Sequence, residues 1–116
     1  MKRRLTTFVA MFAIISLLLV NIDARPVKAE TTRKAEAQYN VLMERMNQFY
    51  QSQQFDKAIA AAEKVADFAN KTFGEDHSHT TTAIFTLAQL YHVLGRLVEA
   101  EVQYLKVLDI YNQSFD

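Results

Sequence analysis

Two histidines and one carboxylate lie close together in a short polar segment: Asp76, His77 and His79. A His-x-His pair beside an acid can bind zinc or copper, provided that a further ligand comes from His92 or from another chain. The alternative is a structural turn, in which Ser78 or Thr80 caps the helix that follows. We favour the structural turn and expect no metal and no other cofactor.

Cysteine is absent from the 116-residue chain, and 13 basic residues balance 13 acidic ones. Without cysteine there is no disulfide, no thiol nucleophile and no cysteine zinc site. A net charge of zero gives no overall basic field for nucleic acid, and two glycines are too few for a Gly-rich phosphate loop. No Ser-His-Asp set stands out, and the acids Glu63 and Asp67 fit a solvated helix face. We therefore predict a protein that is not an enzyme and that binds no nucleic acid.

The first 29 residues have the three parts of an export signal. Basic residues at positions 2–4 precede an apolar run over 5–20, and a polar stretch then ends at Ala29. Signal peptidase cleavage is expected between Ala29 and Glu30, with a cut after Ala24 as the second choice. The alternative is an uncleaved membrane anchor, although the run is shorter than the roughly 20 residues of a spanning helix.

Cleavage would change the charge of the protein. Residues 1–29 hold five basic residues and one acidic residue, so the remaining 87 residues carry 8 basic and 12 acidic side chains. We expect residues 30–116 to form an acidic domain that is periplasmic or extracellular. If residues 1–29 are retained, the same domain would be held at a membrane as an assembly or scaffold subunit.

From residue 31 onward the composition favours helix. This part has no proline, its only glycines are Gly74 and Gly95, and alanine, glutamine, glutamate, lysine and leucine dominate. The breaks predict four helices, near 31–51, 55–72, 79–94 and 97–113. We expect an all-α fold of four antiparallel helices, preceded by an N-terminal hydrophobic signal helix.

Apolar residues recur at steps of three and four in the last two predicted helices, which places them on one face of each. In helix 79–94 they are Ile84, Leu87, Ala88, Tyr91 and Leu94. In helix 97–113 they are Leu97, Ala100, Tyr104, Val107 and Tyr111. We expect these two faces to form the packed interior.

An internal repeat relates the two halves of this region. Aligning segment 55–58 with segment 97–100 gives an offset of 42 residues, and the same offset pairs Val65 with Val107. A period of this length is typical of a helical solenoid, in which each helix pair buries its apolar face against the next. The two helix-turn-helix repeats would span about 39–72 and 81–114.

The second unit carries Leu87-Ala88-Gln89-Leu90-Tyr91, then Gly95, then Glu99-Ala100-Glu101, Tyr104 and Leu108. This pattern resembles a tetratricopeptide repeat, and the 42-residue spacing resembles the longer repeats of kinesin light chains and their bacterial relatives. The first unit is a weaker match, with Arg45 where leucine is usual and Gln53 where glycine is usual. The resemblance covers roughly residues 39–115. It implies a short right-handed solenoid that binds peptides or proteins and has no catalytic activity.

The resemblance also implies which residues would face a ligand, because the first helix of each such pair lines the concave surface. Asn40 and Thr82 belong to this surface, and six further residues form the candidate binding set: Met43, Asn47, Tyr50, Phe85, Gln89 and His92. Aromatic rings there would pack on apolar side chains while amides bind a peptide backbone. The alternative is that all of them are ordinary half-exposed helix residues.

The last predicted helix has a second apolar set, partly off its packing face: Val98, Val102, Leu105 and Leu108. Stacked repeats generally need three or more units, or a polar capping helix, to be stable. Only two units are predicted here, and this surface would normally receive the next helix. We therefore expect it to be covered by self-association or by a partner protein, or the chain to be a shortened member of a longer family.

Overall fold

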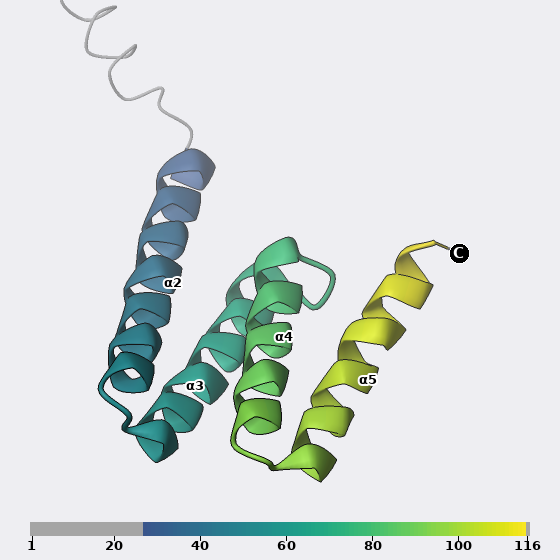
Figure 1. The fold of residues 1–116 in the computed structure, drawn as a ribbon. Helices are drawn as coiled ribbons and strands as arrows, with labels where there is room; N and C mark the ends of the chain where they lie inside the picture. Colours follow the sequence, from purple (N-terminus) through teal and green to yellow (C-terminus); the bar gives the residue numbers. More distant parts are fainter. Residues whose placement is uncertain (1–26, 116) are drawn as a thin grey trace, which may run out of the picture. The chain divides into compact units, whose positions relative to one another are not determined.

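The computed structural model describes residues 27–115, with side chains from residue 28 onward. This part of the chain forms four helices joined by short turns (Figure 1). Their bounds are α2 Val27–Gln51, α3 Phe55–Phe73, α4 Ser78–Val93 and α5 Leu97–Ser114. The four predicted helices are confirmed, and their ends lie within a few residues of the expected positions. Most of the predicted signal segment lies outside the described residues.

The chain divides after Lys34 into two units. The second unit begins at Ala35 and contains the rest of α2 with the other three helices. In Figure 1 each of these helices runs back along the one before it, and α4 lies between α3 and α5. Among residues 27–115 no helix is long and apolar enough to span a bilayer.

The turns that follow α2 and α4 have the same backbone form. Gln53 and Gly95 are 42 residues apart, and their φ angles are 60° and 76°. The Gln54 N–H donates to the Phe49 carbonyl at 2.9 Å, and the Arg96 N–H makes the equivalent bond at 2.8 Å. These bonds satisfy carbonyl groups that the end of a helix leaves free. The repeat is therefore present in the backbone as well as in the side chains.

Side-chain hydrogen bonds hold the turn between α3 and α4. His77 is the N-cap of α4, and its Nδ1 accepts from the His79 backbone N–H at 3.1 Å. The Thr80 hydroxyl donates back to the Gly74 carbonyl at 2.6 Å. The predicted cap at Ser78 or Thr80 is therefore wrong. The His77 imidazole supplies the acceptor of the helix cap, and the Thr80 side chain stabilises the turn by its bond to Gly74.

The interior consists of two clusters of buried side chains. The larger cluster contains Met46, Ile59, Ala61, Ala62, Leu87, Leu90, Tyr91 and Ala100. The smaller cluster contains Tyr39, Val65, Ala69 and Ala83. Alanine recurs in both, and small side chains allow helix backbones to approach one another closely. Close packing of the helices therefore depends on small side chains at these positions.

The packing face is predicted correctly for α4 but only in part for α5. All five residues expected on the packing face of α4 are buried or half-buried. On α5, Ala100 and Val107 are buried as expected, but Leu97 and Tyr111 are 60% and 53% exposed, and Ile110 is buried instead. The reason is that α5 packs mainly against α4, so only the arc that faces α4 is covered.

Candidate peptide-binding surface

On α2 the three candidate residues differ in exposure. Asn47 and Tyr50 are exposed, and the Tyr50 ring makes an edge contact with Phe55 at 5.8 Å between ring centroids. Met43 is half-buried and packs against both core clusters. Met43 therefore contributes to packing, and a ligand on this helix would meet Asn47 and Tyr50.

On α4 all three candidate residues reach solvent. Phe85 is 43% exposed, and Gln89 and His92 are exposed as well. Tyr104 of α5 joins two of them, because its ring lies edge-on to Phe85 at 5.6 Å and edge-on to His92 at 6.3 Å between centroids. The Tyr104 hydroxyl also lies 3.5 Å from His92 Nδ1. We call Phe85, His92 and Tyr104 the aromatic cluster.

Tyr104 is a site residue that the sequence places only on the packing face of its helix. Its equivalent 42 residues earlier is Ala62, which is buried in the core. Tyr111 likewise corresponds to the buried Ala69. A large aromatic residue at a position where the other repeat has a buried alanine indicates a different environment, because a tyrosine ring does not fit into the space that an alanine fills. Comparing the two repeats position by position would have found both tyrosines.

A hollow of about 410 Å³ lies beside Phe85, between α4 and α5. We call it the α4–α5 groove, and its lining residues are Asp76, Ser78, Thr81, Thr82, Phe85, Val107, Ile110, Tyr111 and Ser114. Apolar side chains and hydroxyl groups dominate this lining, and Asp76 is its single charged residue. Such a mixture suits a peptide that brings an apolar side chain together with backbone N–H and C=O groups.

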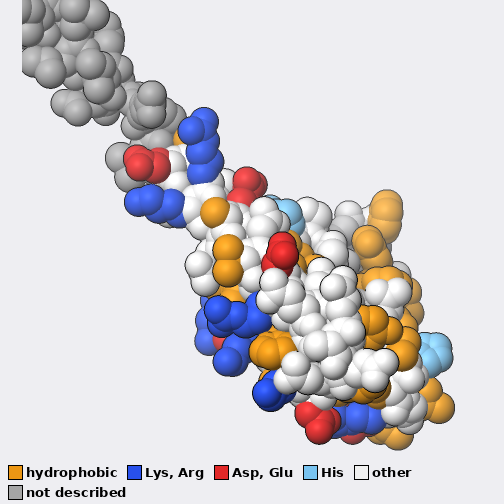
Figure 2. Space-filling model, turned by 60° about the vertical axis from the view of Figure 1, so that its left-hand side comes forward, with side chains coloured by type: hydrophobic (Ala, Val, Ile, Leu, Met, Phe, Trp, Pro, Cys, Tyr) orange, Lys and Arg blue, Asp and Glu red, His pale blue; other side chains and the backbone are white. Residues whose placement is uncertain are grey.

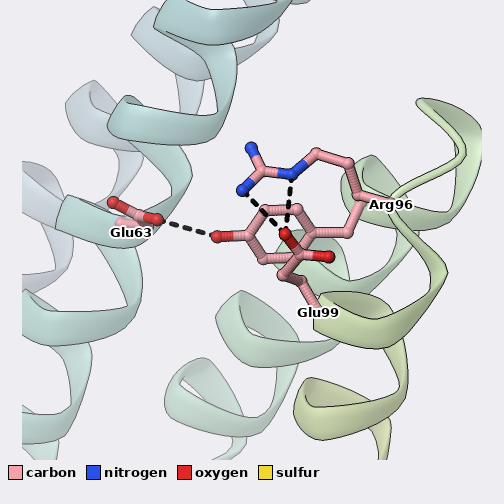
Figure 3. A network of polar contacts seen from close by, with 4 residues as sticks. Glu63, Arg96 and Glu99 are labelled. Atoms are coloured by element: carbon pink, nitrogen blue, oxygen red, sulfur yellow. Dashed lines mark hydrogen bonds and ion pairs between the residues drawn. The ribbon is translucent and has the colours of Figure 1, made fainter.

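A second hollow, of about 460 Å³, is bordered by α3, α4 and α5 and has a different character. Its lining includes four carboxylates and one amine: Glu63, Asp67, Glu75, Asp109 and Lys106. Two of its lining residues, Glu63 and Tyr91, belong to a polar network with Arg96 and Glu99 (Figure 3). This side of the fold is therefore acidic, whereas the α4–α5 groove is nearly uncharged.

The polar network ties α3, α4 and the start of α5 together. The Tyr91 hydroxyl donates to Glu63 at 2.8 Å, and the Arg96 guanidinium lies 4.8 Å from the Tyr91 ring centroid (Figure 3). Arg96 also donates two hydrogen bonds to Glu99, at 3.0 and 3.1 Å. Burial, together with the bond to Glu63, raises the pKa of Tyr91. A backbone hydrogen bond, followed by the Arg96 contact, lowers the pKa of Glu99.

His77 and His79 lie within a stack of aromatic rings. The Phe73 ring lies against His77 at 4.8 Å, the Tyr39 ring lies against His79 at 4.4 Å, and the two imidazoles are 4.9 Å apart. The Tyr39 hydroxyl donates to the His79 carbonyl at 3.2 Å. Within residues 28–115 no group of three His, Asp or Glu side chains is placed to hold a metal ion. The contacts of both histidines are those of a structural turn.

A third hollow, of about 220 Å³, lies between α2 and α3. Its lining combines apolar side chains with three cations: Arg45, Lys57 and Lys64. The Lys57 ammonium lies 5.9 Å from the centroid of the Phe49 ring. Figure 2 shows Lys and Arg side chains gathered beside hydrophobic ones on this side of the molecule. The first helix pair therefore presents a basic edge.

Comparison with protein-family models finds a match over residues 41–113 to the tetratricopeptide repeat. The matched segment is more than half of the chain and spans the second part of α2, all of α3 and α4, and all but the last residue of α5. The chain belongs to the tetratricopeptide repeat family. Comparisons with curated proteins and with solved structures found no match. The family predicted from the sequence is thus confirmed, and the longer kinesin-light-chain type of repeat is consistent with the match.

Tetratricopeptide repeats generally mediate binding between proteins, and they typically have no catalytic function. In such a repeat the two helices meet at small residues, and here Ala88 and Ala100 are buried in α4 and α5. Other residues of the first helix are exposed. In the second tetratricopeptide repeat these include Phe85, Gln89 and His92, which are all exposed.

Proposed function

We propose that this chain is a non-catalytic interaction module that binds a peptide segment of a partner protein in the α4–α5 groove. The observation that carries the proposal is the aromatic cluster, which leaves Phe85 partly exposed at the border of an apolar hollow on a tetratricopeptide scaffold. Exposed aromatic residues beside a concave apolar surface are typical anchors of protein interfaces.

The lining of the groove defines the chemistry of its ligand. An apolar side chain would enter between Phe85 and Tyr111, and the hydroxyl groups of Thr82 and Ser114 offer hydrogen bonds to a peptide backbone. Asp76 at the border favours a basic residue at one end of the bound segment. We therefore propose an apolar peptide with a flanking Lys or Arg as the ligand class.

The test is a selection of displayed peptides on the full-length chain, followed by affinity measurements on variants. Phe85→Ala is expected to weaken binding of a selected peptide about tenfold or more, the usual effect of removing an anchor residue. His92→Ala should weaken it less, because His92 does not line the groove and contacts only Tyr104, whose ring packs against Phe85. Val93→Ala is the matched control, because Val93 is 64% exposed on the same helix but does not line the groove. All variants should keep the wild-type helical circular dichroism.

Binding that is unchanged by Phe85→Ala would exclude the groove as the site. Selection of acidic peptides without apolar residues would contradict the proposed ligand class. Loss of binding in Val93→Ala as well as Phe85→Ala would mean that the contact is not confined to the groove.

We also propose that the domain works outside the cytoplasm, on the basis of the sequence of residues 1–29. Mass spectrometry of the N-terminus of the protein isolated from its host tests this. A chain that begins at Glu30 supports export with cleavage, whereas a chain that keeps Met1 and fractionates with membranes supports an anchored scaffold subunit.

A further inference from the structure

The hollow between α2 and α3 carries positive charge and no negative charge in its lining. We call it the basic hollow, and its lining residues are Leu42, Arg45, Phe49, Lys57, Ala60, Ala61 and Lys64. Its cations come from both helices, since Arg45 belongs to α2 and the two lysines belong to α3. No acidic, amide or hydroxyl side chain is among the lining residues. Such a lining is complementary to an apolar group that has anions beside it.

This concentration of cations runs against the charge of the unit that contains it. From Ala35 onward the chain has 6 basic and 11 acidic residues, yet three of the six basic residues line this one hollow. Two of the other basic residues form ion pairs, one within α3 and one at the start of α5. Among residues 28–115 no carboxylate forms an ion pair with Arg45, Lys57 or Lys64. The three cations can therefore bind anions of another molecule.

Arg45 stands at a position that belongs to the core in the second repeat. Its counterpart 42 residues later is Leu87, which is 5% exposed and lies in the larger core cluster. Arg45 itself is exposed. An arginine that is covered by an apolar helix without a partner for its charge would be costly. The exchange of leucine for arginine therefore indicates that this surface receives a charged ligand and not a further apolar helix.

Phe49 supplies a ring surface among these cations. It is half-buried and packs against the larger core cluster, and the Lys57 ammonium lies 5.9 Å from the centroid of its ring. Arg45 and Phe49 are four residues apart, and Lys57 and Lys64 are seven residues apart, so each pair lies on one face of its helix. A side chain that packs on the Phe49 ring is therefore flanked by cations from both helices.

We propose that the basic hollow binds an acidic peptide segment of a partner protein. One apolar side chain of the segment packs on Phe49, and the Asp or Glu residues beside it pair with the three cations. The hollow shares no lining residue with the α4–α5 groove, so the inference goes beyond the proposed function.

The size of the hollow and the charge of the unit favour a peptide over other anionic ligands. The volume of about 220 Å³ is below the roughly 300 to 1,000 Å³ of small-molecule sites, so one side chain of a larger ligand fits better than a free small molecule. The net negative charge of the unit disfavours an extended anionic surface such as a bilayer or a nucleic acid.

A second copy of this chain fits the basic hollow less well than a separate peptide. Acidic and hydrophobic residues are exposed along α5: Val98, Glu101, Val102, Leu105, Leu108 and Asp109. To continue the repeat, α5 of one copy would have to pack on α2 of the next copy as α3 packs on α4. Tyr104 and Tyr111 would then occupy the positions of the buried Ala62 and Ala69, where a tyrosine ring does not fit. A separate peptide meets no such obstacle.

A differential peptide selection tests the proposal. Displayed peptides are selected on the full-length chain and counter-selected on a double variant, Arg45→Glu with Lys64→Glu. The counter-selection removes peptides that bind the α4–α5 groove, because the double variant keeps that groove. The remaining peptides should carry an apolar residue flanked by Asp or Glu. Their affinity for the double variant should be about tenfold lower or less, because like charges then face one another, and high salt should weaken binding to the wild type. Circular dichroism should remain unchanged, because both substituted side chains are exposed.

Lys106→Glu is the matched control for Lys64→Glu, because Lys106 is the exposed counterpart of Lys64 in the second repeat and does not line the basic hollow. It should leave the affinity for the selected peptides unchanged. Equal losses in these two variants would mean that net charge alone governs binding, and they would overturn the proposal. Enrichment of peptides without acidic residues, or no enrichment at all, would overturn it as well.

Two further measurements address other occupants of the basic hollow. Self-association in sedimentation velocity that the double variant abolishes would assign the hollow to a second copy. Binding to phosphatidylserine vesicles that the double variant abolishes, but Lys106→Glu does not, would assign it to a lipid surface. Either result would replace the partner peptide. Phe85→Ala should not change the affinity for the acidic peptides, so a failure here is distinguishable from a failure of the proposed function.

Discussion

Gln53 holds the turn between α2 and α3 in a backbone conformation that favours glycine. Its φ of 60° lies in the left-handed region, where a side chain costs about 1 kcal/mol or more. The equivalent Gly95 adopts a φ of 76°, and a Cβ added there would meet nothing within 4 Å. The hydrogen bonds of the turn therefore hold Gln53 in a strained conformation that Gly95 adopts without strain.

Gln53→Gly is expected to stabilise the fold by about 0.5 to 1 kcal/mol, because relief of the left-handed strain exceeds the added flexibility of the unfolded chain. Gly95→Gln should destabilise it by about 1 kcal/mol. Urea denaturation followed by circular dichroism measures both. Destabilisation by Gln53→Gly would show that its side chain makes a stabilising contact in the turn.

Some single residues were beyond prediction from the sequence. The composition around His77 predicts a turn, but it also predicts a hydroxyl cap, because serine and threonine are the usual caps. The imidazole takes that role because stacking on Phe73 orients the ring. The repeat register alone predicts Met43 on the ligand face, but register does not show that Met43 packs against two core clusters.

At the scale of helices, α3 packs through its smallest residues. Ala58, Ala62 and Ala69 are almost completely buried, whereas Ala60 of the same helix is exposed. Interiors packed at this density tolerate added volume poorly. The alanine face of α3 therefore sets the distance at which the neighbouring helices lie.

Ala62→Leu is expected to destabilise the fold by about 1 to 3 kcal/mol, because the added side chain has no space in the larger core cluster. Ala60→Leu is the matched control and should change stability by less than about 0.5 kcal/mol. The free energy of unfolding in urea provides the comparison. Equal effects of the two substitutions would mean that helix propensity, and not packing, decides the outcome.

The helices themselves could be predicted, because their ends coincide with breaks that the sequence displays. Gly74, Gly95 and the segment 52–54 each interrupt a long helix-favouring stretch. The burial of α5 was harder to predict, since it depends on which helices lie against it. Leu97 and Tyr111 have the correct spacing for a core face, yet α4 covers only the arc that holds Val107 and Ile110.

At the scale of the whole described unit, each core cluster contains a buried tyrosine, Tyr39 in one and Tyr91 in the other. Burial raises the pKa of both hydroxyl groups above the ordinary value of 10.0. The folded state therefore favours the protonated form of each. Their ionisation links the stability of the whole unit to alkaline pH.

Stability is expected to fall as the pH rises above about 10. Below that value both tyrosines are protonated in the folded and unfolded states, and their contribution is complete. Above it the unfolded chain releases protons first, and the contribution is lost as the pH passes the raised pKa of the folded state. Urea denaturation at a series of pH values checks this.

Tyr91→Phe and Tyr39→Phe should each reduce this alkaline dependence. A stability that is flat through this pH range in the wild type would show that neither hydroxyl is protected by folding.

The arrangement of α4 between α3 and α5 has a consequence for how the chain reaches this structure. α3, α4 and α5 contact their neighbours along the chain, and the contact of α2 with α4 through Tyr39 and His79 joins residues 40 apart, so packing requires the closure of short and medium-length loops. Chains dominated by such local contacts fold within microseconds to milliseconds, roughly. Residues 27–115 also contain no proline, so no prolyl isomerisation should delay any molecule in this region. Refolding of the helical unit should therefore be complete in a single fast kinetic phase.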